Sequence, residues 1–291
     1  MLYTVENEQV RITVREHGAE LRSITEKADG TEYLWNGDPV WWKYSSPVLF
    51  PIVGKLVDGK YRVDGKEYAL PAHGLGRISD FTLVEQTVQS IVFALDWSME
   101  SLQCYPYKFR LEISYTLRGR EIIVSWRVQN QDAKRMSFSI GAHPALLCPI
   151  VPGEKLEDCY LAFSHTEDAQ QCRITPECLL THEKVPGFQG TEMALRDGMF
   201  KDGVFIYDDL KSDTISIRSR KSKKSISVKA AGFTHWGIWS PEKGGAPFVC
   251  VEPWYGHADY ADFHGDFSEK ADSLRLEAGQ EFHTSYSFLL G

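Results

Sequence analysis

The chain has 291 residues, of which 43% are hydrophobic and 12% aromatic, so it can bury a large core. Its net charge of −8 provides no basic surface for nucleic acid, and no apolar run approaches the roughly 20 residues that span a bilayer. The first residues, M-L-Y-T-V-E-N-E, are acidic and do not resemble a signal peptide, so we expect a cytoplasmic protein without nucleic-acid or membrane partners.

Strand patterns dominate the first half of the chain. Residues 61–68 carry Asp64-Gly65 between two short β-rich arms, which predicts a hairpin. Residues 110–117 alternate polar and apolar side chains, and residues 122–128 continue that alternation after a short turn. No convincing amphipathic helix interrupts these segments.

The second half continues in the same way. Residues 214–218 and 225–229 predict two strands around a basic turn, and residues 274–282 repeat a strand–turn–strand pattern. Residues 261–272 have room for one short helical turn. Without linkers, repeats or alternating helices, the pattern predicts an all-β protein, an antiparallel sandwich forming one large domain over residues 1–291.

The six cysteines do not form a metal or disulfide pattern. No C-x-x-C pair occurs, and the closest two cysteines have no matching second half of a zinc site. We therefore expect free thiols in a reducing compartment and no metal site. The cysteines are Cys104, Cys148, Cys159, Cys172, Cys178 and Cys250.

One predicted strand ends at a histidine whose position suggests a function. In residues 136–142 the apolar side chains share one face of the pleat, while serines and a glycine share the other with His143. If the apolar face covers the core, His143 points away from it at the strand end, before Pro144. A core histidine is the alternative interpretation.

Other polar groups stand in similar settings. Lys55 interrupts an apolar run directly after a glycine, where an edge-strand lysine is equally plausible. The segment P-A-H-G-L-G-R, residues 71–77, places His73 and Arg77 around two glycines, and it is not a phosphate-loop pattern. Glu252 ends a hydrophobic strand, where burial would raise its pKa toward neutrality; a surface glutamate is the alternative.

Three tryptophans near strand ends suggest a binding surface. Trp236, Trp239 and Trp254 lie among glycine, histidine and proline, whereas Trp126 lies in regular alternation and is expected in the core. Sugars present C–H faces to aromatic rings and hydroxyls to polar groups, so this composition is typical of a carbohydrate site.

The polar residues limit the reaction class. A hydrolytic triad needs a nucleophile, and no G-x-S-x-G elbow is present. Two histidines and one glutamate could hold a metal, but no H-x-H or H-E-x-x-H motif fixes such a site. A glycosidase needs a second carboxylate, which is unclear here. Reversible proton transfer between a glutamate and a histidine fits what remains.

The chain resembles the aldose 1-epimerase (galactose mutarotase) superfamily, and within it the LacX-like branch. The resemblance rests on five motifs in order with similar spacing, followed by a final L-x-x-G-x-x-F. The motifs are F-P-I-V-G-K-L-V-D-G-K-Y, P-A-H-G-L-G-R, I-G-A-H-P-A, F-K-D-G-V-F-I-Y and V-E-P-W-Y-G. It implies a large antiparallel β-supersandwich and an isomerase that interconverts the anomers of a free sugar without any cofactor.

The resemblance also implies roles for individual residues. Glu252 is similar to the general base of the family and His143 to its general acid, while His73 is similar to a second histidine that holds the sugar. Lys55 stands where family members have a sugar-binding arginine, and lysine cannot grip two hydroxyls as a fork. Asp202 resembles an aspartate that binds sugar hydroxyls, although a loop aspartate before Gly203 explains it equally well.

Two alternatives remain open at this point. A sister branch acts on hexose 6-phosphates, and Lys55 and Arg77 could begin the cationic pocket that a phosphate needs. A sugar-binding protein that has lost turnover would keep the same fold. The only partner that we expect is a small sugar, bound by a monomer or a weak homodimer.

Overall fold

Strands build nearly all of the molecule. The computed structural model describes residues 1–291, with 22 strands, one short α-helix, α1 (Ser101–Cys104), and four single 3₁₀ turns. Every pairing between these strands is antiparallel. The predicted all-β, antiparallel class is confirmed.

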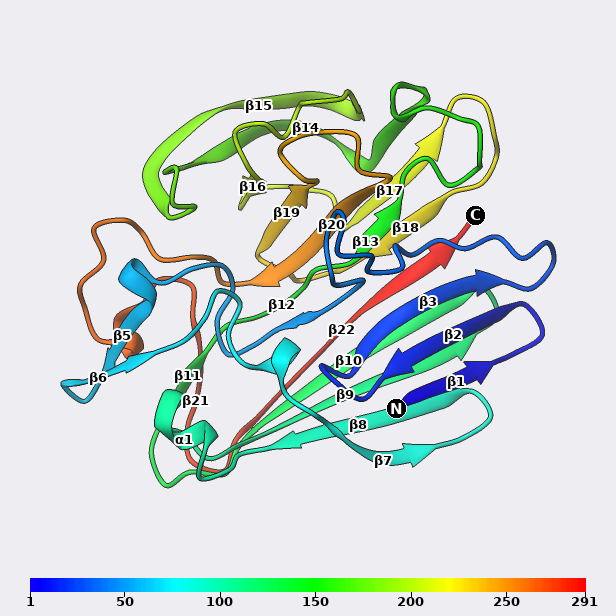
Figure 1. The fold of residues 1–291 in the computed structure, drawn as a ribbon. Helices are drawn as coiled ribbons and strands as arrows, with labels where there is room; N and C mark the ends of the chain where they lie inside the picture. Colours follow the sequence, from blue (N-terminus) through cyan, green and yellow to red (C-terminus); the bar gives the residue numbers. More distant parts are fainter.

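A 15-stranded sheet forms the frame of the fold (Figure 1). Two of its strands lie off the main path: β13 (Ala145–Leu147) pairs with β20, and β15 (Leu180–Ala194) pairs with β14. In spatial order the path runs through β4 (Val48–Leu49), β12 (Ile140–Ala142), β20 (Phe248–Tyr255), β19 (His235–Trp239), β16 (Phe205–Tyr207), β14 (Cys159–Ile174), β17 (Thr214–Ser219), β18 (Ile226–Lys229), β22 (Glu281–Leu290), β10 (Glu121–Asn130), β9 (Phe109–Arg118), β8 (Ser90–Asp96) and β7 (Thr82–Gln86).

Three small sheets complete the fold. In Figure 1 the three-stranded sheet at the N-terminus, drawn in blue, lies across strands β8 to β10. The hydroxyl of Tyr115 in β9 donates a 2.8 Å hydrogen bond to the carbonyl of Ala19 beside β3 and fastens the two layers. The small sheets are β1–β2–β3 (Leu2–Glu6, Val10–Arg15, Glu20–Glu26), β5–β6 (Lys60–Val63, Lys66–Ala69) and β11–β21 (Met136–Phe138, Leu274–Leu276).

The hairpin and the long strands follow the sequence patterns. Asp64 and Gly65 have φ angles of 53° and 77°, the left-handed conformation that a tight hairpin turn requires. Strands β9 and β10 alternate buried and half-buried side chains over their lengths, so one face of each covers the core. The short helical turn expected within residues 261–272 is a 3₁₀ turn, Phe267–Glu269, capped by Asp266.

One prediction about a single segment is wrong. Residues 136–142 do not form one strand, because the chain breaks at Ser139 into β11 and β12, which belong to different sheets. Both faces of this segment are buried, so His143 does not lie on a face turned away from the core. Residues 274–282 form the predicted strand–turn–strand, and the two strands join different sheets, since β21 pairs with β11 and β22 with β10 and β18.

One main hydrophobic core includes residues from the whole length of the chain. A cluster of 60 buried residues extends from Val5 in β1 to Leu290 in β22. None of the six cysteines is in a disulfide, as expected. The structure has no helix with the length and apolar composition needed to cross a membrane.

Candidate active site

Strand β20 places Glu252 on a crowded face of the sheet. Its register with β19 sets Glu252 opposite Gly237 and His235 opposite Trp254, so these side chains share one face. No side chain fits at position 237, because a Cβ on Gly237 would overlap the indole of Trp254. Glu252 does not end the strand as predicted, because β20 continues to Tyr255, and the strand directs the carboxyl group into the protein.

Strand pairing brings His143 to Glu252. Gly141 in β12 pairs with Trp254, and Ala145 in β13 pairs with Cys250, so His143 lies midway, opposite Glu252. The Nδ1 atom of His143 is 3.3 Å from Oε2 of Glu252. Neither that nitrogen nor either carboxyl oxygen of Glu252 forms a hydrogen bond within the protein.

Burial shifts both groups toward their neutral forms. Glu252 is 1% exposed and His143 7%. Burial raises the pKa of Glu252 well above its usual 4.5, and the nearby indole of Trp254 offsets only part of that rise. Burial, followed by the proximity of His73 and Arg77, lowers the pKa of His143 well below 6.5. These two pKa shifts favour placing a proton shared by the pair on Glu252 rather than on His143.

His73 forms the second wall of the site. It adopts a left-handed φ of 66°, and its ring lies 5.4 Å from that of His143. The backbone N–H of Gly54 donates to its Nδ1 at 3.2 Å, which leaves the ring hydrogen on Nε2. Burial, with added repulsion from Arg77 and Lys55, lowers its pKa to about 3. His73 therefore presents a neutral N–H donor.

Two cations, Arg77 and Lys55, act on this histidine. Arg77 lies over the ring of Tyr44 at 4.8 Å and donates a 2.7 Å hydrogen bond to the carbonyl of Ala72. Lys55 is exposed and forms no ion pair. Since both cations lower the pKa of His73, both act on the same part of the site.

Aromatic rings enclose His143 on its other sides. The ring of Trp42 lies 4.6 Å away in a tilted stack, and that of Trp239 lies 5.6 Å away edge-on. Both tryptophans are half-buried, which leaves part of each ring free to contact a ligand. Trp239 was predicted for this role, whereas Trp42 was missed, although the adjacent Trp41-Trp42 pair was a visible signal.

The other predicted aromatic and acidic residues have different places. Trp236 is buried in the main core, and Trp254 is buried beneath the site, where its indole N–H donates to the carbonyl of Ala142 at 3.2 Å. Asp202 is exposed in the turn before β16, and its carboxylate has no hydrogen bond or ion pair. No contact joins Asp202 to His143 or Glu252.

The donor set at this site is poorly prepared for a metal ion. His143, Cys250 and Glu252 offer three ligand atoms within 4.8 Å of one another. Burial raises the pKa values of both Cys250 and Glu252, so a metal would have to displace a proton from each. Without a metal, the arrangement offers one acid and one base side by side, with a neutral donor and two cations at the edge.

The sequence matches a known protein family and a curated relative. The aldose 1-epimerase family profile matches residues 1–275. Protein LacX (chromosomal) of Lactococcus lactis subsp. lactis is 36% identical over 265 residues, covering 88% of each chain.

Two solved structures share the fold over the whole chain. A galactose mutarotase related enzyme from Lactobacillus acidophilus superposes with a TM-score of 0.95 at 32% identity, covering 100% of this chain and 97% of that one. A galactose mutarotase-like protein from Lactobacillus casei superposes with a TM-score of 0.94 at 30% identity, covering 100% of both chains. The resemblance drawn from the sequence motifs is confirmed.

Proposed function

We propose that this chain, which belongs to the aldose 1-epimerase family, is an isomerase that interconverts the α and β anomers of a free sugar. The observation that carries this proposal is the pair of Glu252 and His143. Their facing atoms are 3.3 Å apart, buried and without hydrogen-bond partners in the protein. Leaving such buried groups without hydrogen-bond partners costs stability, so the presence of this pair supports a chemical function.

The proton inventory of the reaction matches the pair. Ring opening removes a proton from the anomeric hydroxyl and delivers one to the ring oxygen; rotation about C1–C2 and the reverse transfers close the ring on the other face. One base and one acid are sufficient, so the pair needs a single proton between its members. Burial supports that state, because it raises the pKa of Glu252 and lowers that of His143.

Sugar binding sets the direction of transfer. In the free protein burial favours the proton on Glu252, whereas catalysis uses Glu252 as the base and His143 as the acid. A sugar hydroxyl that donates to Glu252 stabilises the carboxylate, and the ring oxygen accepts from His143, so the bound sugar favours moving the proton across the 3.3 Å gap. Both groups then face the atoms whose protons they exchange.

The surrounding residues supply contacts to the sugar. The Nε2–H of His73 donates to a sugar oxygen, and the half-buried rings of Trp42 and Trp239 pack against C–H groups. Lys55 and Arg77 donate to hydroxyls at the open edge. Asp202 accepts from a hydroxyl only if its turn closes toward the site, so its role is the most distant from the present geometry.

The proposal is tested by measuring anomer exchange directly. Polarimetry and NMR exchange spectroscopy on a panel of free aldoses, with and without the protein, should show accelerated mutarotation of at least one sugar. A protein that binds a sugar from the panel without accelerating its exchange is a binding protein on this fold, and that result would contradict the enzymatic proposal.

A phosphorylated sugar is the second candidate substrate. Lys55 is exposed and has no carboxylate partner, while Arg77 lies near enough for both to act on His73. If a phosphate binds there, Lys55→Met should raise the KM for a hexose 6-phosphate about 10-fold and leave the KM for the free hexose nearly unchanged. An equal effect on both sugars would assign Lys55 to a hydroxyl instead.

A further inference from the structure

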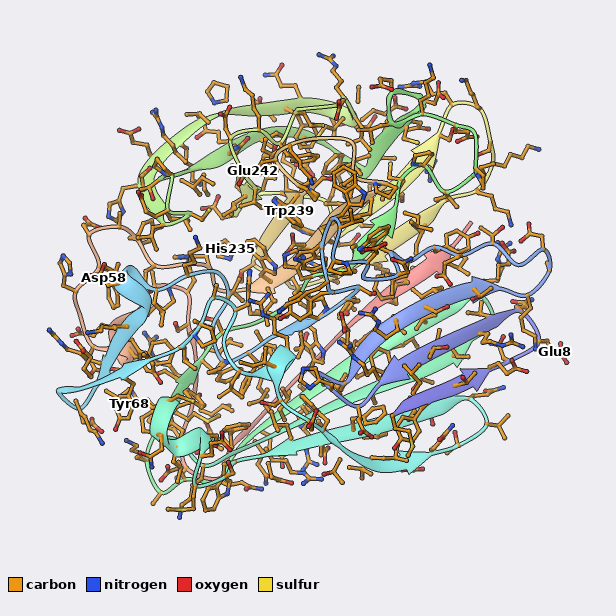
Figure 2. All side chains as sticks on the ribbon, in the orientation of Figure 1. Glu8, Asp58, Tyr68, His235, Trp239 and Glu242 are labelled. Carbon is orange, nitrogen blue, oxygen red and sulfur yellow. The ribbon has the colours of Figure 1, made fainter.

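A second cluster of histidine and carboxylate groups lies on the same face as the candidate active site. The Nε2 atoms of His235 and His257 lie 3.7 Å and 3.3 Å from Oδ2 of Asp272. All three atoms are within 4.8 Å of one another. His235 begins β19, and Figure 2 shows it at the opposite end of that strand from Trp239.

A hydrogen bond to the other ring nitrogen fixes the tautomer of His257. Its Nδ1 atom lies 2.5 Å from the carbonyl of Ala258, so it carries the hydrogen and donates it. A lone pair on Nε2 of His257 therefore faces Asp272. Nδ1 of His235 lies 2.8 Å from the hydroxyl of Thr234, and either atom can be the donor.

An unpartnered lone pair of a buried histidine thus faces a carboxylate. His257 is 1% exposed, and its Nε2 forms no hydrogen bond although the carboxylate is only 3.3 Å away. Such a lone pair and a carboxylate oxygen repel each other unless a cation lies between them. The geometry points to a divalent transition-metal site, and we propose that His235, His257 and Asp272 bind Zn²⁺.

The spacing and the outer contacts agree with this ion. Bonds of about 2.0–2.1 Å in a tetrahedral arrangement place ligand atoms about 3.3 Å apart, close to the 3.3 and 3.7 Å distances from Asp272. Metal-binding histidines usually donate the other ring hydrogen to a carbonyl, hydroxyl or carboxylate, as His257 does to Ala258, and the hydroxyl of Thr234 offers His235 a similar partner. Two nitrogens and one oxygen leave a fourth position for water.

An approach route and a structural role follow from the surroundings. A cavity of about 200 Å³ is lined by His257 and by the ion pair of Lys270 with Asp259, whose charges cancel. Asp272 itself is 55% exposed and lies in the connection between β20 and β21. A bound ion would fasten this connection to β19 and stabilise the fold, with the indole of Trp254 lying between it and Glu252.

Direct metal binding tests the proposal with the untagged full-length chain after dialysis against EDTA. Titration with Co²⁺, followed by its visible absorption, and with Zn²⁺, followed by calorimetry, should show one ion per chain and a rise in Tm. Asp272→Asn should weaken Zn²⁺ at least ~100-fold, since even outer-contact substitutions cost about 10- to 100-fold. Asparagine also accepts the φ of 53° at this position, so the fold should persist.

A matched control separates this cluster from an incidental surface site. His182 lies 3.0 Å from Asp262 at the edge of the same cavity, so Asp262→Asn removes an exposed histidine–carboxylate pair and should leave Zn²⁺ affinity unchanged. Absence of stoichiometric binding, or equal affinity in wild type and Asp272→Asn, would overturn the proposal. NMR showing His257 protonated on both nitrogens in the presence of excess Zn²⁺ would also overturn it, because a proton would then occupy the gap.

Discussion

The Nδ1 atom of His143 lies 3.3 Å from Oε2 of Glu252, yet no hydrogen bond joins these two buried groups or joins them to the rest of the protein. This relationship depends on β20, which pairs with β12 just before His143 and with β13 just after it. The pKa of Glu252 is raised and that of His143 lowered, so a proton shared by the pair favours Glu252. The proposed reaction uses this proton when a sugar is bound.

Replacing Glu252 by glutamine should separate activity from stability. The amide of the Glu252→Gln variant cannot accept the anomeric proton, so anomer exchange should fall at least ~100-fold, the scale of general acid–base catalysis. The folded protein should become more stable at neutral pH by about 1 kcal/mol, because the variant removes a buried carboxyl group that the unfolded chain can ionise and the fold disfavours in its ionised form. Exchange rates and denaturant unfolding on the same samples measure both effects.

The pH dependence of the stability difference is the internal control. Because the folded pKa of Glu252 is raised, the folded state keeps a proton that the unfolded state releases above pH 4.5. Wild-type stability is therefore lost relative to Glu252→Gln as the pH rises above 4.5, and the two proteins converge below it. A difference that is constant with pH, or full activity in the variant, would contradict the ionisation proposed for this group.

The pH profile of kcat/KM should not decline as the pH falls through 6.5. The active form carries one proton on the pair, and a second proton is added only below the lowered pKa of His143, which is well below 6.5. On the alkaline side activity should fall as the pH passes the raised pKa of Glu252. A profile that declines as the pH falls through 6.5 would mean that His143 titrates like an exposed imidazole.

Local periodicity was sufficient for the strands whose environment is uniform. Arg110 to Leu117 and the Asp64-Gly65 turn occur as predicted, because each depends on one buried face or on a few dihedral angles. Residues 136–142 alternate equally well, yet the chain breaks at Ser139 and both faces are covered. The second face of residues 136–142 is covered by strands that are distant in sequence, and the local alternation of side chains carries no information about them.

The site divides in the same way. Ordered motifs identified Glu252, His143, His73, Lys55 and Arg77 as a group, and the structure brings these five together. The lowered pKa of His143 could not be predicted from the sequence. The burial of this residue and its proximity to His73 arise from the pairing of separate strands. Asp202 shows the limit of transferring a motif, since the residue matches but no contact connects it to the pair.

The histidine cluster could not be found from spacing. His235 and His257 are separated by 22 residues, and Asp272 lies a further 15 along the chain, which matches no short metal-binding motif. The register of β19 with β20 and the return of the chain toward β21 bring them together. The expectation of no metal site was drawn from cysteine and histidine spacing alone, and the structure gives reason to test it.

Chelators and reducing agents should leave anomer exchange intact at 25 °C. The proton transfers use only Glu252 and His143, and all six cysteines are free thiols, so dithiothreitol has no disulfide to break. EDTA should lower Tm by removing the proposed ion without slowing exchange, and dithiothreitol should change neither quantity. Loss of exchange that Zn²⁺ or Ca²⁺ restores would place a metal at His143, Cys250 and Glu252 instead.

Replacing His143 by asparagine should reduce turnover far more than stability or affinity. His143 packs against Trp42 at 4.6 Å, so the smaller side chain should cost about 1–2 kcal/mol of unfolding free energy. Sugar affinity should fall by the ~1 kcal/mol typical of one hydrogen bond, whereas exchange should drop at least ~100-fold. Ile140→Val in the adjoining β12 is the matched control, because it also costs about 1 kcal/mol of stability while leaving the imidazole in place.

If both variants lose activity only in proportion to unfolded protein, His143 is a structural histidine. If neither variant nor wild type exchanges anomers while all bind sugar, the chain is a binding protein. Tm, sugar affinity and exchange rate measured on the same three samples decide among these outcomes.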